Sequence, residues 1–320
     1  MDFLLYLLKI ERDTMLRKYI FLLFSLILFV GCSSKNIYNM ALKYERNNAN
    51  LEKKFQTLSF GKIAYLENTT REKETIVLLH GFGANKDNWD RFVSAIKGQY
   101  HIIIPDLAGH GESTLNMDLN YTLSHHVRRL KIFLQSKNIT SFHIVGNSMG
   151  GGIALLYSHL HQEEIKTLTL IDSIGIMKTK SDIMHHIEET GNNPFLDVCN
   201  HEKFDILLEY GMYKKPYIPD FIKTLLIEEK CKNALLEKKM YVDLIKNINL
   251  INTAKQITIP TLIIWGEKDK ILHVNNAKSF HQEIKNSKLK IFKESGHVPM
   301  FEIPIKTART FENFITSLKE

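Results

Sequence analysis

The chain has 320 residues, of which 44% are hydrophobic and 24% are charged. This composition fits a globular protein with a sizeable core, and it excludes a disordered or collagen-like chain. The net charge is +7, but lysines are scattered among acidic residues in segments such as EKK, REKE and LEKKM, without a basic stripe. We therefore expect a lysine-rich solvated surface and no nucleic-acid partner.

The N-terminal segment has the pattern of an export signal. From Met15 the sequence reads MLRKYIFLLFSLILFVGCSSK, with two cations, an eleven-residue and almost wholly apolar run from Ile20 to Val30, and then small residues. This order is typical of a secretory signal, and eleven residues are too few to span a bilayer. We predict a signal peptide over residues 1–31. Charged residues before Met15 would interrupt a signal that began at Met1, which makes Met15 a candidate start.

The end of this segment, Phe29-Val30-Gly31-Cys32, resembles the lipobox of bacterial lipoproteins, with Phe29 where that family usually has Leu, Val or Ile. The resemblance implies that Cys32 is lipidated, and Ser33 after it resembles the lipoproteins sorted to the outer membrane. We expect an exported protein anchored at the outer membrane or on the periplasmic face. Two alternatives stay open: a signal anchor kept as a membrane helix, and secretion after ordinary cleavage with Cys32 free.

Two further cysteines, Cys199 and Cys231, follow this segment. Two cysteines do not make a disulfide framework, so we expect them to be free or to form at most one bridge.

Past residue 50, apolar runs alternate with segments of helical spacing. The apolar runs suit buried parallel strands and cover residues 75–80, 100–106, 142–147, 167–172, 261–266 and 289–294. Helical spacing lies between most of them, at residues 89–96, 125–135, 153–160 and 277–284. The alternation predicts an α/β fold with a mostly parallel central sheet and helices on both faces. Ligands then belong at the carboxyl ends of the strands.

The alternation stops once, at residues 173–257, where helix-like stretches are joined by NNP and KKPYIPD. We predict a helical cap inserted into a core made of residues 55–172 and 258–320, with residues 32–54 as an N-terminal tether. A separate second domain is the alternative, but predicted strands on both sides favour a cap.

The sequence Gly146-Asn147-Ser148-Met149-Gly150 follows a predicted strand and precedes a predicted helix. G-x-S-x-G in this context is typical of a nucleophile elbow, where glycines let strand and helix approach around a strained turn and the serine oxygen projects above the sheet. The alternative is a tight turn whose serine caps the helix.

A serine nucleophile needs a base that a third group orients, in the chain order serine, acid, histidine. Asp269 lies just past one predicted strand, in WGEKDKIL, and His297 lies just past the next, in KESGHVPMFE. Both residues therefore fall on the sheet edge that holds Ser148. Two other acids remain open for the acid position, Glu267 in the same loop and Asp172 after TLTLI.

An oxyanion hole needs two backbone N–H donors. We assign Met149, the first residue of the predicted helix, and Phe82 in the loop HGFG, where the alternative is a simple strand-ending turn. The loop DLAGHGES lies on the same edge, and there we prefer a turn held by Asp106 over a catalytic His110.

In this order and at these spacings, HGFG, PDLAGHGES, GNSMGGG, WGEKD and GHVPMFE resemble the α/β-hydrolase superfamily over about residues 58–318. More narrowly, HGFGANKDNW, GNSMGGGIAL, the NNP and MYKKPYIPD of the insertion, and GHVPMFE resemble the bacterial family V lipases, which are cold-active esterases of fatty acyl chains. The resemblance implies hydrolysis of carboxylic esters such as acylglycerols through an acyl-enzyme, with Ser148, Asp269 and His297 as the triad. Such a mechanism needs no metal or organic cofactor.

The expected partners are a lipid or small acyl-ester substrate and, through the N-terminal anchor, a membrane; the sequence indicates no obligate protein partner. Apolar and aromatic residues of the insertion are candidates for an acyl pocket, although packing of the cap onto the sheet accounts for most of them. They are Ile174, Ile176, Met177, Phe195, Leu196, Met212, Tyr213, Tyr217 and Phe221.

The same fold also serves other functions. A C–C bond hydrolase of the meta-cleavage type resembles the chain in GNSMGG, but that group typically carries Trp after the histidine, where this chain has Val298. An acyltransferase or peptidase with the same triad remains an alternative, whereas dehalogenases and epoxide hydrolases carry Asp in place of Ser148. If the protein were a surface lipoprotein without activity, we would expect at least one triad residue to be replaced, but Ser148, Asp269 and His297 are all present.

Overall fold

The computed structural model describes residues 33–70 and 73–319. The predicted signal at residues 1–31 and the predicted lipidation site, Cys32, lie outside the described residues. The chain divides into two compact units, Met1–Leu42 and Lys43–Glu320, and helix α3 (Ser34–Asn48) runs from one into the other. Among the described helices, none combines the length and the apolar character that a membrane crossing requires.

The second unit is built on one eight-stranded sheet with the order β1-β2-β4-β3-β5-β6-β7-β8. The strands from β4 through β8 pair in parallel, and this arrangement confirms the predicted α/β fold. The strands are β1 (Glu52–Leu58), β2 (Gly61–Glu67), β3 (Thr75–Leu79), β4 (His101–Pro105), β5 (Phe142–Asn147), β6 (Ile165–Ile171), β7 (Thr261–Gly266) and β8 (Ser287–Phe292).

The sequence reasoning missed the hairpin of β1 and β2 at one edge of the sheet. β1 is paired antiparallel to β2, and its residues EKKFQTL alternate between exposed and half-buried. A half-exposed edge strand carries polar residues on its outer face, so it lacks the continuous apolar run that marks the buried parallel strands. The first strand was therefore not predicted. It begins at Glu52, so the last residues of the segment predicted as a tether belong to the sheet.

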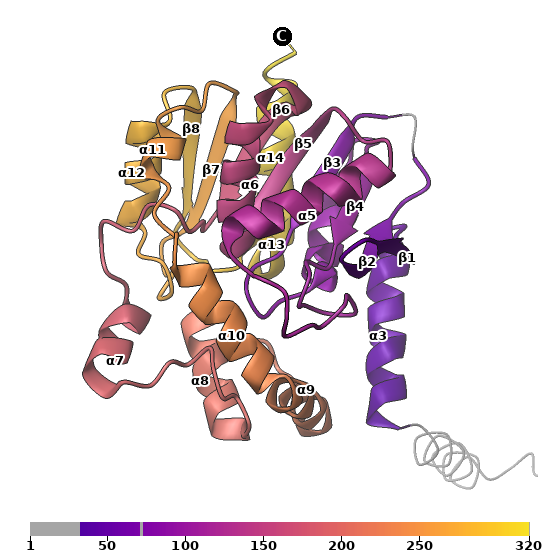
Figure 1. Cartoon of the computed structure of the whole chain (residues 1–320), viewed down its shortest axis with the longest axis vertical. Helices are drawn as coiled ribbons and strands as arrows, with labels where there is room; N and C mark the ends of the chain where they lie inside the picture. The colour runs from indigo at the N-terminus through magenta and orange to yellow at the C-terminus, as the bar shows by residue number, and fades with distance from the viewer. Residues whose placement is uncertain (1–32, 71–72, 320) are drawn as a thin grey trace, which may run out of the picture. The chain divides into compact units, whose positions relative to one another are not determined.

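Helices cover both faces of the sheet, as predicted (Figure 1). On one face α5 (Leu123–Ser136), α6 (Met149–Leu160) and α12 (Asn275–Glu283) bury apolar side chains such as Phe133 and Phe280. On the other face α4 (Asp90–Ala95) and α14 (Pro304–Thr316) bury Phe92 and Phe311, whose rings lie 5.9 Å apart. Each such side chain contributes about 1.5–3 kcal/mol to the stability of the fold.

Five helices lie between β6 and β7 in the chain; α7, α8, α9 and α10 lie beyond one end of the sheet in Figure 1, whereas α11 lies beside α12. Two of them, α8 and α9, pack around a small cluster of Val198, Phe204 and Ile227, and a disulfide joins Cys199 to Cys231 beside it. Of the two states expected for these cysteines, the structure therefore has the single bridge. The five helices are α7 (Asp182–Thr190), α8 (His201–Gly211), α9 (Asp220–Lys232), α10 (Ala234–Ile245) and α11 (Ile251–Ala254).

Three short helices complete the unit: η1 (Lys86–Trp89), η2 (Gln162–Glu164) and α13 (Pro299–Glu302). Of these, η1 follows the HGFG loop after β3, and α13 follows the loop that carries His297. Both therefore belong to segments that build the sheet edge described next.

Candidate active site

Ser148 lies at the sharp turn between β5 and α6. Its φ of 55° and ψ of −116° are a strained combination for a residue with a side chain. Its side chain makes no capping hydrogen bond to the helix, so the alternative of a helix-capping serine does not hold. Ser148 is partly exposed, whereas its neighbours Asn147 and Met149 are buried. Ser148 is therefore accessible to solvent, whereas the residues on either side of it are not.

The glycines around Ser148 are needed for close backbone approach. A Cβ atom on Gly146 would lie 2.1 Å from the carbonyl oxygen of Gly150, and one on Gly150 would lie 2.3 Å from that of Leu79. These contacts are with backbone atoms, which no side-chain rotation relieves. The turn between strand and helix therefore requires glycine at both positions.

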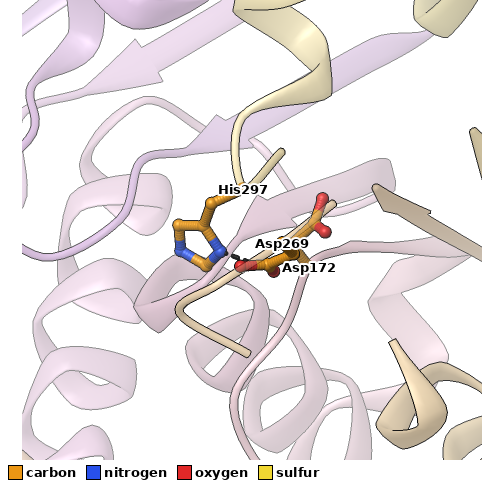
Figure 2. Close-up of side chains that lie close together, drawn as sticks. All are labelled: Asp172, Asp269 and His297. Atoms are coloured by element: carbon orange, nitrogen blue, oxygen red, sulfur yellow. Dashed lines mark hydrogen bonds and ion pairs between the residues drawn. The ribbon is translucent and has the colours of Figure 1, made fainter. Parts of the chain in front are cut away.

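The structure brings Asp269 and His297 into direct contact. Nδ1 of His297 lies 2.8 Å from Oδ2 of Asp269, and both side chains are buried (Figure 2). The other oxygen of Asp269 accepts hydrogen bonds from the backbone N–H groups of Ile271 and Leu272, at 2.8 and 2.9 Å. These bonds fix the carboxylate, which in turn fixes the orientation of the imidazole ring.

The two rival acids have other partners. Glu267 is exposed and its carboxylate lies 3.5 Å from Nζ of Lys268. Asp172 is buried and accepts a hydrogen bond from the N–H of Gly266 at 2.9 Å. Of the three candidate acids, Asp269 is the one hydrogen-bonded to His297.

Asn147 connects the serine turn to the histidine loop. Its Nδ2 donates to the carbonyl oxygens of His297 at 3.0 Å and of Ile171 at 3.1 Å. Since Asn147 precedes Ser148 directly, these two bonds place the backbone of His297 beside the elbow. Sequence reasoning missed this role, because the middle residues of G-x-S-x-G carry no constraint that a single sequence reveals.

Glu302 holds the same loop from the other side. One of its carboxylate oxygens accepts from the N–H of Gly296 at 2.7 Å, and the other accepts from the N–H groups of Tyr213 and Lys214 at 2.9 and 3.1 Å. The backbone N–H of His297 donates to the carbonyl oxygen of Gly211. The histidine loop is therefore tied to the end of α8 in the inserted helices. The sequence motif GHVPMFE contains Glu302, but two of its partners, Tyr213 and Lys214, lie too far away in the chain to be predicted.

The loop that carries Phe82 lies against Ser148. A Cβ atom on Gly81 would lie 3.2 Å from Cβ of Ser148, so the two segments are in contact. Within the described part of the chain, the backbone N–H groups of Phe82 and Met149 donate no hydrogen bond. Both N–H groups are thus free to bind an oxygen atom placed next to Ser148.

The neighbouring loop at residues 106–113 is a turn organised by Asp106. Its carboxylate accepts from the N–H groups of Lys86 and Glu112, at 2.7 and 2.8 Å, and pairs with Nζ of Lys86 at 2.9 Å. His110 is buried in this turn, and burial lowers its pKa to about 3. Nδ1 of His110 lies 3.2 Å from the carbonyl oxygen of Ala108, within the same turn, and the turn held by Asp106 accounts for the motif.

Two aromatic residues of the inserted segment, Phe195 in the loop before α8 and Tyr241 in α10, pack on Phe82. The ring of Phe82 meets those of Phe195 and Tyr241 edge-on, with centroids 6.3 and 5.9 Å apart. Among the other apolar candidates of the insertion, Ile174 and Ile176 are buried in the main core, while Tyr217 is 91% exposed. Packing therefore explains several of these residues, and Phe195 is the one whose ring contacts Phe82.

The donor atoms of Asp172, Asp269 and His297 lie within 4.8 Å of one another, close enough to bind a cation in principle. However, Nδ1 of His297 faces a carboxylate oxygen at hydrogen-bond distance, so this nitrogen carries the proton and offers no lone pair to a metal. The arrangement fits an acid that orients a base.

Comparison with known proteins agrees with this geometry. The family model for the alpha/beta hydrolase fold matches residues 74–196 and 212–304. Lipase 1 of Psychrobacter immobilis is 36% identical over 93% of this chain and 96% of its own length, and Lipase 3 of a Moraxella species is 35% identical over 93% and 97%. The crystal structure of a bacterial membrane phospholipase A superposes with a TM-score of 0.87 at 31% identity, over 95% of this chain and 98% of that one.

These matches confirm the resemblance that the motifs indicated, including the narrower one to bacterial lipases. They extend over almost the whole chain rather than over the motifs alone. The chain belongs to the α/β-hydrolase family.

Proposed function

We propose that the protein is a serine carboxylester hydrolase, a lipase that cleaves fatty acyl esters such as acylglycerols. The observation that carries this proposal is a partly exposed serine in a strained elbow, beside a buried Asp269–His297 pair with a 2.8 Å hydrogen bond. The similarity to lipases over 93% of the chain supports the ester as the bond that is cleaved. Ser148 is the nucleophile, His297 the base and Asp269 the acid.

The first half of the reaction acylates Ser148. Nε2 of His297 takes the hydroxyl proton while Oγ of Ser148 attacks the ester carbonyl carbon. The negative charge that develops on the carbonyl oxygen is held by the backbone N–H groups of Phe82 and Met149. His297 then gives its proton to the alcohol oxygen, the C–O bond breaks, and the alcohol leaves.

The second half releases the acid. A water molecule loses a proton to Nε2 of His297 and attacks the acyl carbon, and the same two N–H groups hold the second oxyanion. His297 returns the proton to Oγ of Ser148, and the fatty acid departs. Throughout, Asp269 keeps Nδ1 protonated and stabilises the imidazolium form.

The inserted helices supply the surroundings of the substrate. We assign residues 173–257 as a cap on the core of residues 55–172 and 258–320, and the ring of Phe195 on Phe82 brings cap side chains to the oxyanion loop. An apolar, aromatic wall at this position suits an acyl chain.

Membrane attachment through a lipidated Cys32 belongs to the same proposal. The Cys199–Cys231 disulfide supports export, because such bonds persist in oxidising compartments. Mass spectrometry of the purified N-terminus tests the anchor. We expect a lipid-modified peptide that begins at Cys32, and an unmodified peptide across Gly31-Cys32 would rule the anchor out.

The ester-hydrolysing activity is tested with p-nitrophenyl esters of increasing chain length on the full-length protein in detergent. We expect hydrolysis of medium or long acyl esters, lost in Ser148→Ala. Ser158→Ala is the matched control, since Ser158 lies in the helix that follows Ser148, is fully buried, and its hydroxyl has no hydrogen-bond partner among the described residues. Absence of hydrolysis at every chain length from folded protein would contradict the lipase assignment.

A further inference from the structure

A second buried carboxyl group lies beside the Asp269–His297 pair. Asp172 follows β6 and is 0% exposed, and its backbone N–H donates to the carbonyl oxygen of Ile264 at 3.0 Å. Its φ of 43° lies in the left-handed region, so the fold holds this residue at some cost in backbone energy. Figure 2 shows the three side chains together, and one oxygen or nitrogen atom from each lies within 4.8 Å of the other two.

The two carboxyl groups differ in the hydrogen bonds that they accept. Asp269 accepts three, from the backbone N–H groups of Ile271 and Leu272 and from Nδ1 of His297. Asp172 accepts one at Oδ1, from the N–H of Gly266, while its Oδ2 is buried without a donor among the described residues. A negative charge is therefore better stabilised on Asp269 than on Asp172.

Two carboxyl groups this close in a site without bulk water do not both ionise. Burial and then the neighbouring charge of Asp269 raise the pKa of the Asp172 carboxyl well above its usual range, and Glu302 adds a smaller effect of the same sign. The N–H of Gly266 acts in the opposite direction. A side-chain hydrogen bond between Asp172 and Asp269 also raises the pKa of Asp172, so the proton of the pair lies on Asp172.

We propose that Asp172 is a positioning residue for the catalytic acid: in its neutral form it donates a hydrogen bond to Asp269 and holds that carboxylate against Nδ1 of His297. This inference rests on the proposed function, because it concerns the acid of the same triad. Asp172 acts through Asp269 and contacts no reacting atom. The pair carries one negative charge, which matches the single positive charge that His297 acquires in the reaction.

The protonation state is tested by infrared spectroscopy of the full-length protein, in which a protonated carboxyl has a C=O band separate from carboxylate bands. We expect Ser148→Ala to keep the Asp172 band and Asp172→Asn to lose it. Asp90→Asn is the matched control, because Asp90 is also buried and burial raises its pKa to about 8. The Asp90 band titrates away near that pH, whereas the Asp172 band persists.

The positioning role is tested by kinetics with two variants. Asp172→Asn keeps a hydrogen-bond donor, and asparagine tolerates positive φ, so we expect kcat/KM within about threefold of wild type and an unchanged acidic limb of the pH profile. Asp172→Gly removes the donor at a φ that suits glycine, and we expect kcat/KM to fall about 10- to 100-fold. Circular dichroism verifies that both variants fold.

Three results would overturn the proposal. The first is wild-type protein without a band that Asp172→Asn removes. The second is an Asp172→Asn acidic limb shifted by about one unit to lower pH, since this shift reports the loss of a negative charge beside His297. The third is wild-type kcat/KM in folded Asp172→Gly. If the wild type hydrolyses no ester, the proposed function fails, and the infrared comparison still decides the state of Asp172.

Discussion

Nδ2 of Asn147 donates a hydrogen bond to the backbone carbonyl oxygen of His297, across 3.0 Å and 150 residues of sequence. The turn at Ser148 and the histidine loop are thereby linked through the residue that precedes Ser148. This link holds the backbone of His297, the proposed base, beside the turn of the proposed nucleophile without using the side chain of either one.

Replacement of Asn147 by alanine removes this link and leaves the carbonyl oxygen of His297 without a donor among the described residues, whereas that of Ile171 keeps the N–H of Ser148. We expect Asn147→Ala to lose about 1–3 kcal/mol of unfolding free energy and at least about tenfold in kcat/KM. Asn276→Ala is the matched control, since Asn276 is equally buried and bonds the backbone of Thr179. Urea unfolding and ester hydrolysis are measured on both. Equal kcat/KM in the two variants would show that Asn147 serves stability alone.

The four hydrogen bonds that Glu302 accepts join the histidine loop to the end of α8. Glu302→Gln turns an amide N–H₂ toward N–H donors, and we expect kcat/KM to fall about 10- to 100-fold. The comparison is Glu312→Gln, because Glu312 also accepts from two backbone N–H groups, those of Lys97 and Gly98, far from the site. Unchanged kcat/KM in Glu302→Gln would mean that the loop holds its position without this carboxylate.

The packing at Gly150 predicts a severe effect of a single methyl group. A Cβ atom there would lie 2.3 Å from the carbonyl oxygen of Leu79 and 2.6 Å from that of His80. We expect Gly150→Ala to destabilise the protein by about 3 kcal/mol or more, because α6 must move away from β3. Gly211→Ala serves as the control, since the nearest atom to its Cβ is 4.0 Å away. Thermal unfolding of both variants decides the matter, and equal midpoints would contradict the packing argument.

The Cys199–Cys231 bridge closes a segment with a sequence separation of 32 that contains α8 and most of α9. We expect its removal in the double Cys→Ser variant to destabilise these helices by about 3–4 kcal/mol on the chain-entropy estimate. Urea unfolding with and without a reductant measures the effect. The free energy of unfolding of the wild type is expected to fall in the reductant, and that of the double variant is expected to stay unchanged. A wild type that does not respond to complete reduction would contradict the prediction.

Buried histidines make stability depend on pH. Burial lowers the pKa of His143 to about 4, from 6.5, and its Nδ1 bonds Oγ1 of Thr167. As the pH falls, His143 is protonated in the unfolded chain before it is protonated in the folded one. Its contribution to the unfolding free energy is therefore present above about pH 6.5 and is lost as pH falls toward 4, with a slope of at most about 1.4 kcal/mol per pH unit. His80 and His110 act in the same direction.

Between about pH 6.5 and pH 4.5 the unfolding free energy of the wild type falls with pH. We expect this fall to be less steep in His143→Gln, by up to the slope that one bound proton gives. His281→Gln, at an exposed position, is expected to keep the wild-type slope. Urea unfolding across this pH range tests both variants. Parallel curves for wild type and His143→Gln would show that another group dominates the acid sensitivity.

The sequence determined the buried parallel strands and the helices between them, because continuous apolar runs and helical periodicity are local signals. It also determined the order of serine, acid and histidine candidates at one sheet edge, since parallel strands bring their carboxyl ends together. It did not reveal β1, whose polar, half-exposed residues lack such a run, and it allowed either free cysteines or one bridge.

Only the tertiary structure decided which of the candidate acids contacts His297. Asp172, Glu267 and Asp269 all follow strands on the same edge, and their distances to His297 depend on loop conformations that no periodicity encodes. The roles of Asn147 and Glu302 could likewise not be predicted, because each bonds a segment that is distant in the sequence. Local patterns therefore fix which elements form and which residues share an edge, whereas hydrogen bonds between loops fix which side chains meet.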